Sequence, residues 1–156
     1  MANDHGLDLE FLNHFWTSDV KPPLMEALLA APEDKLDWAP GEKMMSLGNV
    51  FMHIGETSMW WIGKIIDNME YKDITPGPSF PRDKIRQLME DHWHRIDGFF
   101  MRSPRIIEKS YGYTHNGKEI KYEGRWILIH LLEHDIHHRC QINQYLRILG
   151  IEPPRI

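Results

Sequence analysis

Four histidines lie within nine residues near the end of the sequence, in the segment HLLEHDIHHRCQINQYL at residues 130–146. A helical wheel places His134 and His138 in the middle of one apolar face. Side chains four residues apart are roughly 40° apart around a helix and about 6 Å apart along it, so both can converge on one ion. The pair therefore predicts a metal site in the core. The apolar residues of that face are Ile127, Leu131, Ile142, Tyr145 and Leu149.

A pair of hydrogen-bonded core histidines is the alternative interpretation. Histidine is intermediate in its tendency to be buried, and a single buried ring often finds a polar partner. Two facing rings are harder to satisfy, because they repel each other when protonated and each neutral ring leaves an acceptor nitrogen in apolar surroundings. A divalent ion satisfies both nitrogens at once, so the pattern favours metal binding.

A zinc-like site usually takes three protein ligands and keeps a further position open. His53, in the segment NVFMHIGE, is the best candidate for the third ligand, because it flanks the apolar stripe of the most hydrophobic helical pattern. His130 is an alternative, either as a ligand or as a residue that orients one. His92 and His94 are predicted to lie on the polar surface of their helix, and His137 near the polar edge of its own.

Helical patterns separated by breakers must position these histidines. The first begins at LDLEFLNHFWTSDV, and we expect it to bend at Pro22-Pro23 and to end near Pro32. The second is SLGNVFMHIGETSMWWIGKIID, for which Ser46 is the predicted N-cap. The third is RDKIRQLMEDHWHRIDGFFM, and it follows the loop TPGPSFPRD.

The fourth helical pattern runs from near Gly124 to Gly150. Before it, the segment YGYTHNGKEIKY alternates around Asn116-Gly117, which predicts a β-hairpin. The sequence therefore predicts an all-α fold, an antiparallel four-helix bundle with short connections and a small β-hairpin before the last helix. We expect one domain over residues 1–156.

Composition argues against several classes of function. No segment approaches the eighteen or so apolar residues that a membrane span needs, and the acidic start of the sequence does not resemble a secretory signal, so we expect a cytoplasmic protein. The net charge of -5 disfavours nucleic acid as a partner. Cys140 is the only cysteine, which excludes a thiolate zinc site and leaves nitrogen and oxygen as metal ligands.

Two motifs together carry a resemblance to a known family. HLLEHDIHHRCQINQYLRILG resembles the C-terminal signature of the DinB/YfiT-like family of metal-binding four-helix bundles. LDWAPGEKMMSLGNVFMHIGE is similar to the family's other landmark, a Trp-x-Pro loop that leads into a helix with one histidine and a glutamate three residues later. The resemblance covers nearly the whole chain and implies that His53, His134 and His138 hold a divalent ion. Zinc and nickel suit such ligands best.

Cys140 stands where the family commonly has glycine. The helical wheel places it about 120° from His134, so it faces away from the ligands. We expect this substitution to affect packing more than chemistry.

A divalent ion held by three neutral imidazoles keeps its full charge, which favours loss of a proton from a water or a thiol. Some family members resemble thiol-dependent S-transferases and others amidohydrolase-like proteins. The resemblance therefore implies a metal-dependent transferase or hydrolase that acts on a small molecule, with a low-molecular-weight thiol as a candidate partner. Asp135 and Glu56 are the candidate acid–base groups, or residues that support the ligands. The alternative is a non-catalytic metal-binding or interaction module.

Two other metal sites fit the sequence less well. The segment HDIHH mimics the His-Glu-x-x-His motif of metalloproteases, but aspartate is one methylene shorter than glutamate, and a protease needs an edge strand to bind its substrate. A ferritin-like di-iron centre needs two Glu-x-x-His motifs, and the sequence contains none.

Two expectations concern assembly and access. A second apolar arc on the fourth helix predicts a homodimer. We expect the substrate to enter at the end of the bundle that carries both the 38–40 loop and the hairpin. The residues of the second arc are Leu128, Leu132 and Ile136.

Overall fold

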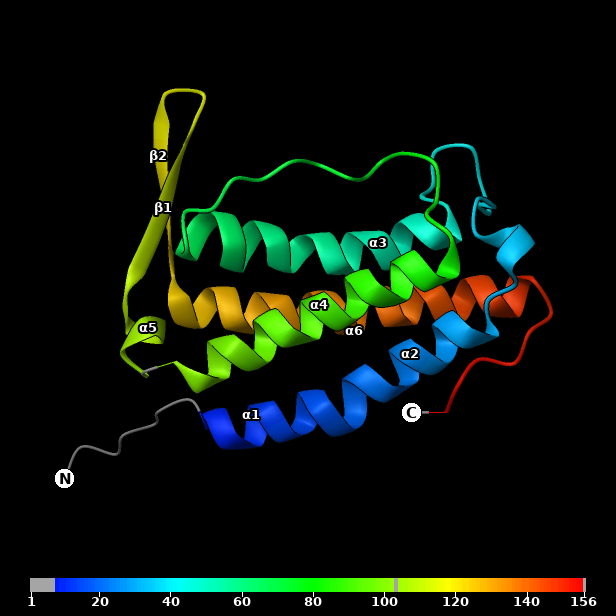
Figure 1. The fold of residues 1–156 in the computed structure, drawn as a ribbon, viewed down its shortest axis with the longest axis horizontal. Helices are drawn as coiled ribbons and strands as arrows, with labels where there is room; N and C mark the ends of the chain where they lie inside the picture. Colours follow the sequence, from blue (N-terminus) through cyan, green and yellow to red (C-terminus); the bar gives the residue numbers. More distant parts are fainter. Residues whose placement is uncertain (1–7, 103, 156) are drawn as a thin grey trace.

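The structure, a computed structural model, describes residues 8–102 and 104–155. This part of the chain is mostly helical and contains one two-stranded antiparallel sheet, directly before the last helix. In Figure 1 the long helices lie side by side and the hairpin projects from one end of them. The elements in chain order are α1 (Leu9–Phe15), the π-helical segment η1 (Trp16–Val20), α2 (Lys21–Ala30), the short 3₁₀ helix η2 (Glu33–Lys35), α3 (Leu47–Ser58), the π-helical segment η3 (Met59–Ile66), α4 (Arg82–Met101), α5 (Arg105–Glu108), β1 (Ser110–His115), β2 (Lys118–Glu123) and α6 (Gly124–Ile148).

The first helical region changes its backbone geometry where the sequence predicts a bend. Pro22 and Pro23 lie in the first turn of α2, where a missing backbone N–H costs least, and the π-helical turn of η1 precedes them. Figure 1 shows the axis of α2 inclined to that of α1. The predicted bend is therefore confirmed, and α2 ends at Ala30, near the expected end at Pro32.

Helix α3 is the most deeply buried element that carries a candidate ligand. Ser46 caps it as predicted, because the Ser46 Oγ accepts a hydrogen bond from the backbone N–H of Asn49 at 3.2 Å. Every residue of α3 except His53 is buried. The helix is therefore accessible to solvent only at the residue that the sequence identifies as the third ligand.

Helices α3 and α4 run in the same direction. The 67–81 segment returns along α3 to its start. There the side-chain amide of Asn49 donates a hydrogen bond to the carbonyl oxygen of Gly77 and accepts one from the Gly77 backbone N–H. At the other end, Arg102 after α4 pairs with Asp67 after η3. The predicted antiparallel order with short connections is wrong for this pair. The physical reason is length, because fifteen residues can span about 50 Å, enough to recross the roughly 30 Å of α3 and η3.

The β-hairpin turns where the sequence predicts. Residues His115 and Lys118 pair across the end of the strands, and the two residues between them, Asn116 and Gly117, have φ values of 50° and 75°. Positive φ at both turn residues is typical of a type I′ turn, whose twist matches that of the flanking strands. The hairpin leads directly into α6, which begins at Gly124.

The two loops that were expected to frame the site entrance lie at opposite ends of α6. Trp38 packs edge-on against Tyr145, in the last turns of α6, with 5.9 Å between ring centroids. The hairpin instead joins Gly124, the first residue of α6, which lies about 32 Å from Tyr145 along the helix. The prediction that both loops form one entrance is wrong, because no local pattern shows at which end of the last helix each loop packs.

Most of the second apolar arc of α6 packs inside the chain. Leu128 is fully buried, Leu132 is 9% exposed, and Ile136 is partly covered by the core. Burial of this arc removes part of the reason to expect a partner helix, and the homodimer stays a prediction. In the described ranges, 8–102 and 104–155, no helix combines the length and the apolar character needed to cross a membrane.

The start of α6 allows a stability test of the packing against α5. An added Cβ at Gly124 would lie 2.4 Å from the carbonyl oxygen of Ile106 and 2.8 Å from the Cα of Ile107, so the backbone would have to shift. We expect Gly124→Ala to lower the free energy of unfolding by about 1–3 kcal/mol, as overpacking does. Urea denaturation followed by circular dichroism measures this change.

Gly98→Ala in α4 is the matched control. Its added Cβ would meet no heavy atom within 4 Å, apart from its chain neighbours and its own helix backbone, among the described residues. This change should raise the free energy of unfolding by about 0.5–1 kcal/mol through helix propensity. Equal stability of the two variants would contradict the close packing at Gly124.

Candidate metal centre

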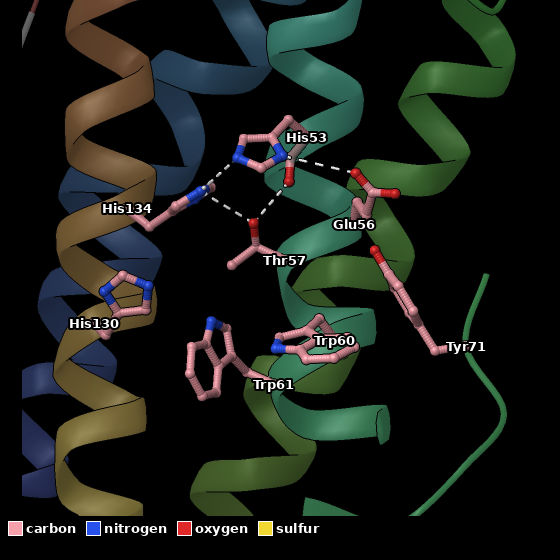
Figure 2. Close-up of a pocket in the computed structure, with 8 residues that line it drawn as sticks. All are labelled: His53, Glu56, Thr57, Trp60, Trp61, Tyr71, His130 and His134. Atoms are coloured by element: carbon pink, nitrogen blue, oxygen red, sulfur yellow. Dashed lines mark hydrogen bonds and ion pairs between the residues drawn. The ribbon is translucent and has the colours of Figure 1, made fainter. Parts of the chain in front are cut away.

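Three histidines from two helices converge in one place. His53 of α3 and His134 and His138 of α6 each offer a ring nitrogen, and these nitrogens all lie within 4.8 Å of one another. The Nε2 atoms of His53 and His134 are 3.1 Å apart, and Figure 2 shows the two rings directed toward each other. The structure thus brings together the three residues that the sequence identifies, and their role as ligands stays a prediction.

The spacing of these nitrogens fits a shared ion. Two nitrogens that are each about 2.0–2.1 Å from a zinc ion are about 3.3–3.4 Å apart at a tetrahedral angle and about 2.9 Å apart at a right angle. The separation of 3.1 Å between His53 and His134 falls between these values. The ring of His138 has its centroid 4.4 Å from that of His134 and 5.0 Å from that of His53, so it lies close to both other rings.

His134 and His138 are neutral, which is the form that binds metal. Burial, together with the neighbouring histidines His138 and His53, lowers the pKa of His134 to about 2. Burial also lowers the pKa of His138, although its hydrogen bond to Gln141 acts in the opposite direction. No proton therefore has to leave these two rings at neutral pH before an ion can bind.

The Nε2 atom of His134 has two close neighbours. It lies 3.1 Å from His53 Nε2 and 3.1 Å from the hydroxyl of Thr57, which donates to the carbonyl oxygen of His53 at 2.8 Å. Its Nδ1 is buried and has no hydrogen-bond partner among the described residues. Two neutral Nε2 atoms at this distance share at most one hydrogen, whereas a cation between them can use both lone pairs. The donor set therefore fits a divalent ion.

A chain of hydrogen bonds orients His138. Its Nδ1 lies 2.8 Å from the Oε1 of Gln141, and the Gln141 amide donates to the hydroxyl of Tyr145 at 3.1 Å. The Tyr145 hydroxyl in turn donates to the carbonyl oxygen of Met45 at 3.2 Å. With Nδ1–H donating to Gln141, the Nε2 lone pair is free to face the other histidines. Sequence reasoning missed Gln141, although its spacing of three residues from His138 was a usable signal.

Glu56 holds the 67–81 segment against α3 beside His53. Its Oε1 accepts from the backbone N–H groups of Ile74 at 2.5 Å and Thr75 at 3.3 Å, and its Oε2 accepts from the Thr75 hydroxyl. Burial acts to raise the pKa of Glu56, but these donors, with a further contribution from Tyr71, outweigh burial and lower the pKa. Its Oε2 also lies 3.7 Å from His53 Nδ1. Glu56 is therefore an ionised carboxylate whose oxygens are already engaged.

Asp135 is directed toward another part of the core. It is fully buried, and its Oδ2 accepts from the indole N–H of Trp16 at 2.8 Å and lies 2.9 Å from His92 Nε2. The prediction of a surface position is wrong for His92, which is fully buried because its ring bonds to this carboxylate. His94 and His137 are exposed, in agreement with the sequence.

An open cavity of about 270 Å³ adjoins the histidines. Tyr71 and Trp60 form one wall and pack edge-on, with 5.0 Å between ring centroids. Burial raises the pKa of the Tyr71 hydroxyl, which also donates to Asp73 at 2.9 Å. Figure 2 shows the cavity wall. Its residues are His53, Glu56, Thr57, Trp60, Trp61, Tyr71, His130 and His134.

His130, the alternative third ligand, belongs to the cavity wall. Its ring stacks on Trp126 with 4.7 Å between centroids, and its centroid is 6.0 Å from that of His134. It is not one of the three histidines whose nitrogens converge. Cys140 is exposed and so faces away from the ligands, as expected.

Comparison with known proteins identifies the family. The model of the DinB family matches residues 1–156, and the chain belongs to that family. The fold is similar to that of a DinB-like protein from Bacillus subtilis, with a TM-score of 0.71 and 18% identity over 94% of this chain and 96% of that one. A DinB-like protein from Bacillus cereus is similar to the same extent, with a TM-score of 0.71 and 16% identity over the same shares. A comparison with curated proteins found no match.

The hydrogen bond from His138 to Gln141 predicts an effect on metal affinity. Gln141→Leu removes the acceptor that fixes the ring, so we expect zinc to bind about 10- to 100-fold more weakly. Gln141→Glu keeps an acceptor at this position and should retain most of the affinity. Competition with a chromophoric chelator measures the dissociation constant.

Gln144→Leu, at an exposed position one residue before Tyr145, is the control and should bind zinc as the unmodified protein does. If Gln141→Leu and Gln144→Leu bind zinc equally well, Gln141 has no role in positioning His138.

Proposed function

We propose that this protein is a metal-dependent enzyme in which His53, His134 and His138 hold one divalent ion, zinc or nickel. The observation that carries the proposal is that three convergent imidazoles, of which the two on α6 are neutral, lie beside an open cavity. Structural zinc sites are usually closed by four protein ligands, whereas catalytic sites keep a position open toward the substrate. A purely structural metal site would not need an open cavity beside its ligands.

The residues of the cavity suit a small and partly apolar substrate. When bound, the ion supplies positive charge that lowers the pKa of a thiol or water and polarises an oxygen of the substrate. Trp60, Trp61 and Tyr71 provide apolar surface that holds the substrate and limits access of water. The hydroxyl of Thr57, beside His134, can accept a hydrogen bond from a bound group.

Among the two reactions that fit, transfer to a thiol is favoured over hydrolysis. Hydrolysis at such a centre commonly uses a carboxylate as general base. Glu56 is the only carboxylate among the cavity residues, and its oxygens bind the 67–81 segment, while Asp135 is bonded to Trp16 and His92. A thiol, with a pKa near 8.5, needs less help to lose its proton than water does. We therefore propose a thiol-dependent S-transferase.

The packing of the helices supports a finer statement of the fold. We infer that four helical units form a four-helix bundle in which α3 and α4 run in the same direction. The first unit is α1 with α2, the second is α3 with η3, and the third and fourth are α4 and α6. Contacts across the core support it, because Trp16 and His92 both bond to Asp135 of α6, and Thr57 of α3 contacts His134. Asp135 then serves to hold three helices together.

Metal content tests the ligand set. The purified, reconstituted protein should contain about one divalent ion per chain, and His134→Ala should lose it because the central imidazole is removed. His137→Ala changes an exposed histidine and should retain the metal. Elemental analysis measures both. Equal metal content in the two variants, or none in the unmodified protein, would contradict the assignment.

Conjugation of a thiol tests the activity. The zinc- or nickel-loaded protein should accelerate the reaction of a low-molecular-weight thiol, such as cysteine or glutathione, with chlorodinitrobenzene. In this reaction the thiolate sulfur forms the new bond to the ring carbon and chloride leaves. His138→Ala should abolish the acceleration, and His137→Ala should keep it. A metal-loaded protein that accelerates conjugation of no thiol would favour the non-catalytic metal-binding module.

A further inference from the structure

A second cavity shares the lining residue Trp60 with the cavity at the candidate metal centre. It measures about 310 Å³ and lies between η3 and strand β1 of the hairpin. Trp60 lines both cavities, and its indole packs edge-on against Tyr71 of the 67–81 segment and Tyr113 of β1, at 5.0 and 5.4 Å between centroids. Tyr71 and Tyr113 therefore hold the indole ring of Trp60, which lines both cavities, in place.

The polar side chains of the second cavity include a cation and two groups that can donate hydrogen bonds. Lys64, Asn68 and Thr114 line it, and no acidic residue is among its lining residues. Among residues 8–102 and 104–155, no carboxylate forms an ion pair with Lys64. Asp67, which lies between Lys64 and Asn68 in the chain, is bound through both oxygens by Arg102 at 2.5 and 2.7 Å. Its charge is therefore already balanced.

Such a cavity favours an anion. In a chain of net charge -5, an ammonium group without a partner carboxylate on a cavity wall provides a local positive field. Lysine acts as a compact point charge toward either a carboxylate or a phosphate, whereas bidentate recognition of both groups favours arginine. The amide of Asn68 and the hydroxyl of Thr114 can donate to the same oxygens. One cation and two neutral donors suit an anion of a single charge, and a carboxylate is such an anion.

We infer that the second cavity binds a carboxylate at the far end of the substrate whose reacting group lies at the three histidines. This inference rests on the proposed function and adds to it a class of substrate, an elongated organic acid. His53 and Lys64 are eleven residues apart, which is about 16 Å along a helix. The lysine side chain covers part of this distance, so the substrate spans roughly eight to ten bonded atoms between its reacting group and its carboxylate.

Paired probes of equal length test the inference. ω-Mercaptooctanoate places a thiol and a carboxylate at about the required distance, and ω-mercaptooctanamide is its neutral counterpart. Isothermal titration calorimetry with the metal-loaded, full-length protein should show the acid binding about three- to fivefold more tightly than the amide, as expected for a partly exposed ion pair. Lys64→Met should reduce this ratio to about one.

Lys43→Met is the matched control, because it removes an equal charge at an exposed position in the connection between η2 and α3. It should keep the preference for the acid. The inference is overturned if the unmodified protein binds the acid and the amide equally, if it binds neither, or if Lys64→Met keeps the preference.

A separate measurement distinguishes this failure from failure of the proposed function. Mercaptoethanol, which has no carboxylate, should change the visible spectrum of the cobalt-substituted protein if a thiol reaches the ion. A spectral change without any preference for the acid would leave the metal centre in place and remove only the carboxylate site. An unchanged spectrum with a Lys64-dependent preference would remove the thiol chemistry and retain the carboxylate site.

Discussion

The close approach of imidazole rings between α3 and α6 is the constraint on which the rest of the site depends. Rings whose centroids are 4.4–5.0 Å apart cannot all be protonated without strong repulsion, and burial opposes the charged form as well. His134 and His138 of α6 are therefore neutral, and their ring nitrogens lie close to that of His53. On α3 only His53 is not buried, and the open cavity beside it is lined also by residues of η3, the 67–81 segment and α6.

The position of the 67–81 segment, which crosses back over α3, depends on the buried carboxylate of Glu56. Glu56 receives two backbone N–H groups and one hydroxyl from Ile74 and Thr75, and these bonds keep its carboxylate ionised although it is only 4% exposed. A carboxylate satisfied in this way fixes the middle of a long connection that contains no regular secondary structure. The crossing gives α3 and α4 the same direction and brings Tyr71 to the cavity wall. One residue of α3 therefore links the fold to the shape of the site.

Local signals predicted much of this structure. The Asn116-Gly117 turn, the Ser46 cap, the prolines of α2 and the helical spacing of His134 and His138 each depend on a few neighbouring residues, and each was confirmed. His92 was misplaced although it lies on the same apolar stripe as Met89 and Ile96. The stripe could have been read from the sequence, but the acidic partner that makes burial acceptable could not, because Asp135 is 43 residues away in the chain.

The parts that could not be predicted are those that depend on tertiary register. Nothing local to the 67–81 segment shows whether it turns or recrosses a helix, and nothing local to Trp38 shows that it packs at the far end of α6. His53 was the best candidate for the third ligand because it flanks an apolar stripe, the resemblance to a family implied the same residue, and the structure places it near the other two histidines. The role of the Gln141 amide in orienting His138 can be recognised only once His138 is known to face His53.

X-ray absorption at the metal edge of the zinc-loaded protein counts the imidazoles around the ion and measures their distances, and so tests whether the three histidines bind it. We expect three imidazole nitrogens at about 2.0–2.1 Å. In the His53→Ala protein we expect either two imidazoles or loss of the metal. One or two imidazoles in the unmodified protein, or an unchanged spectrum after His53→Ala, would contradict this ligand set.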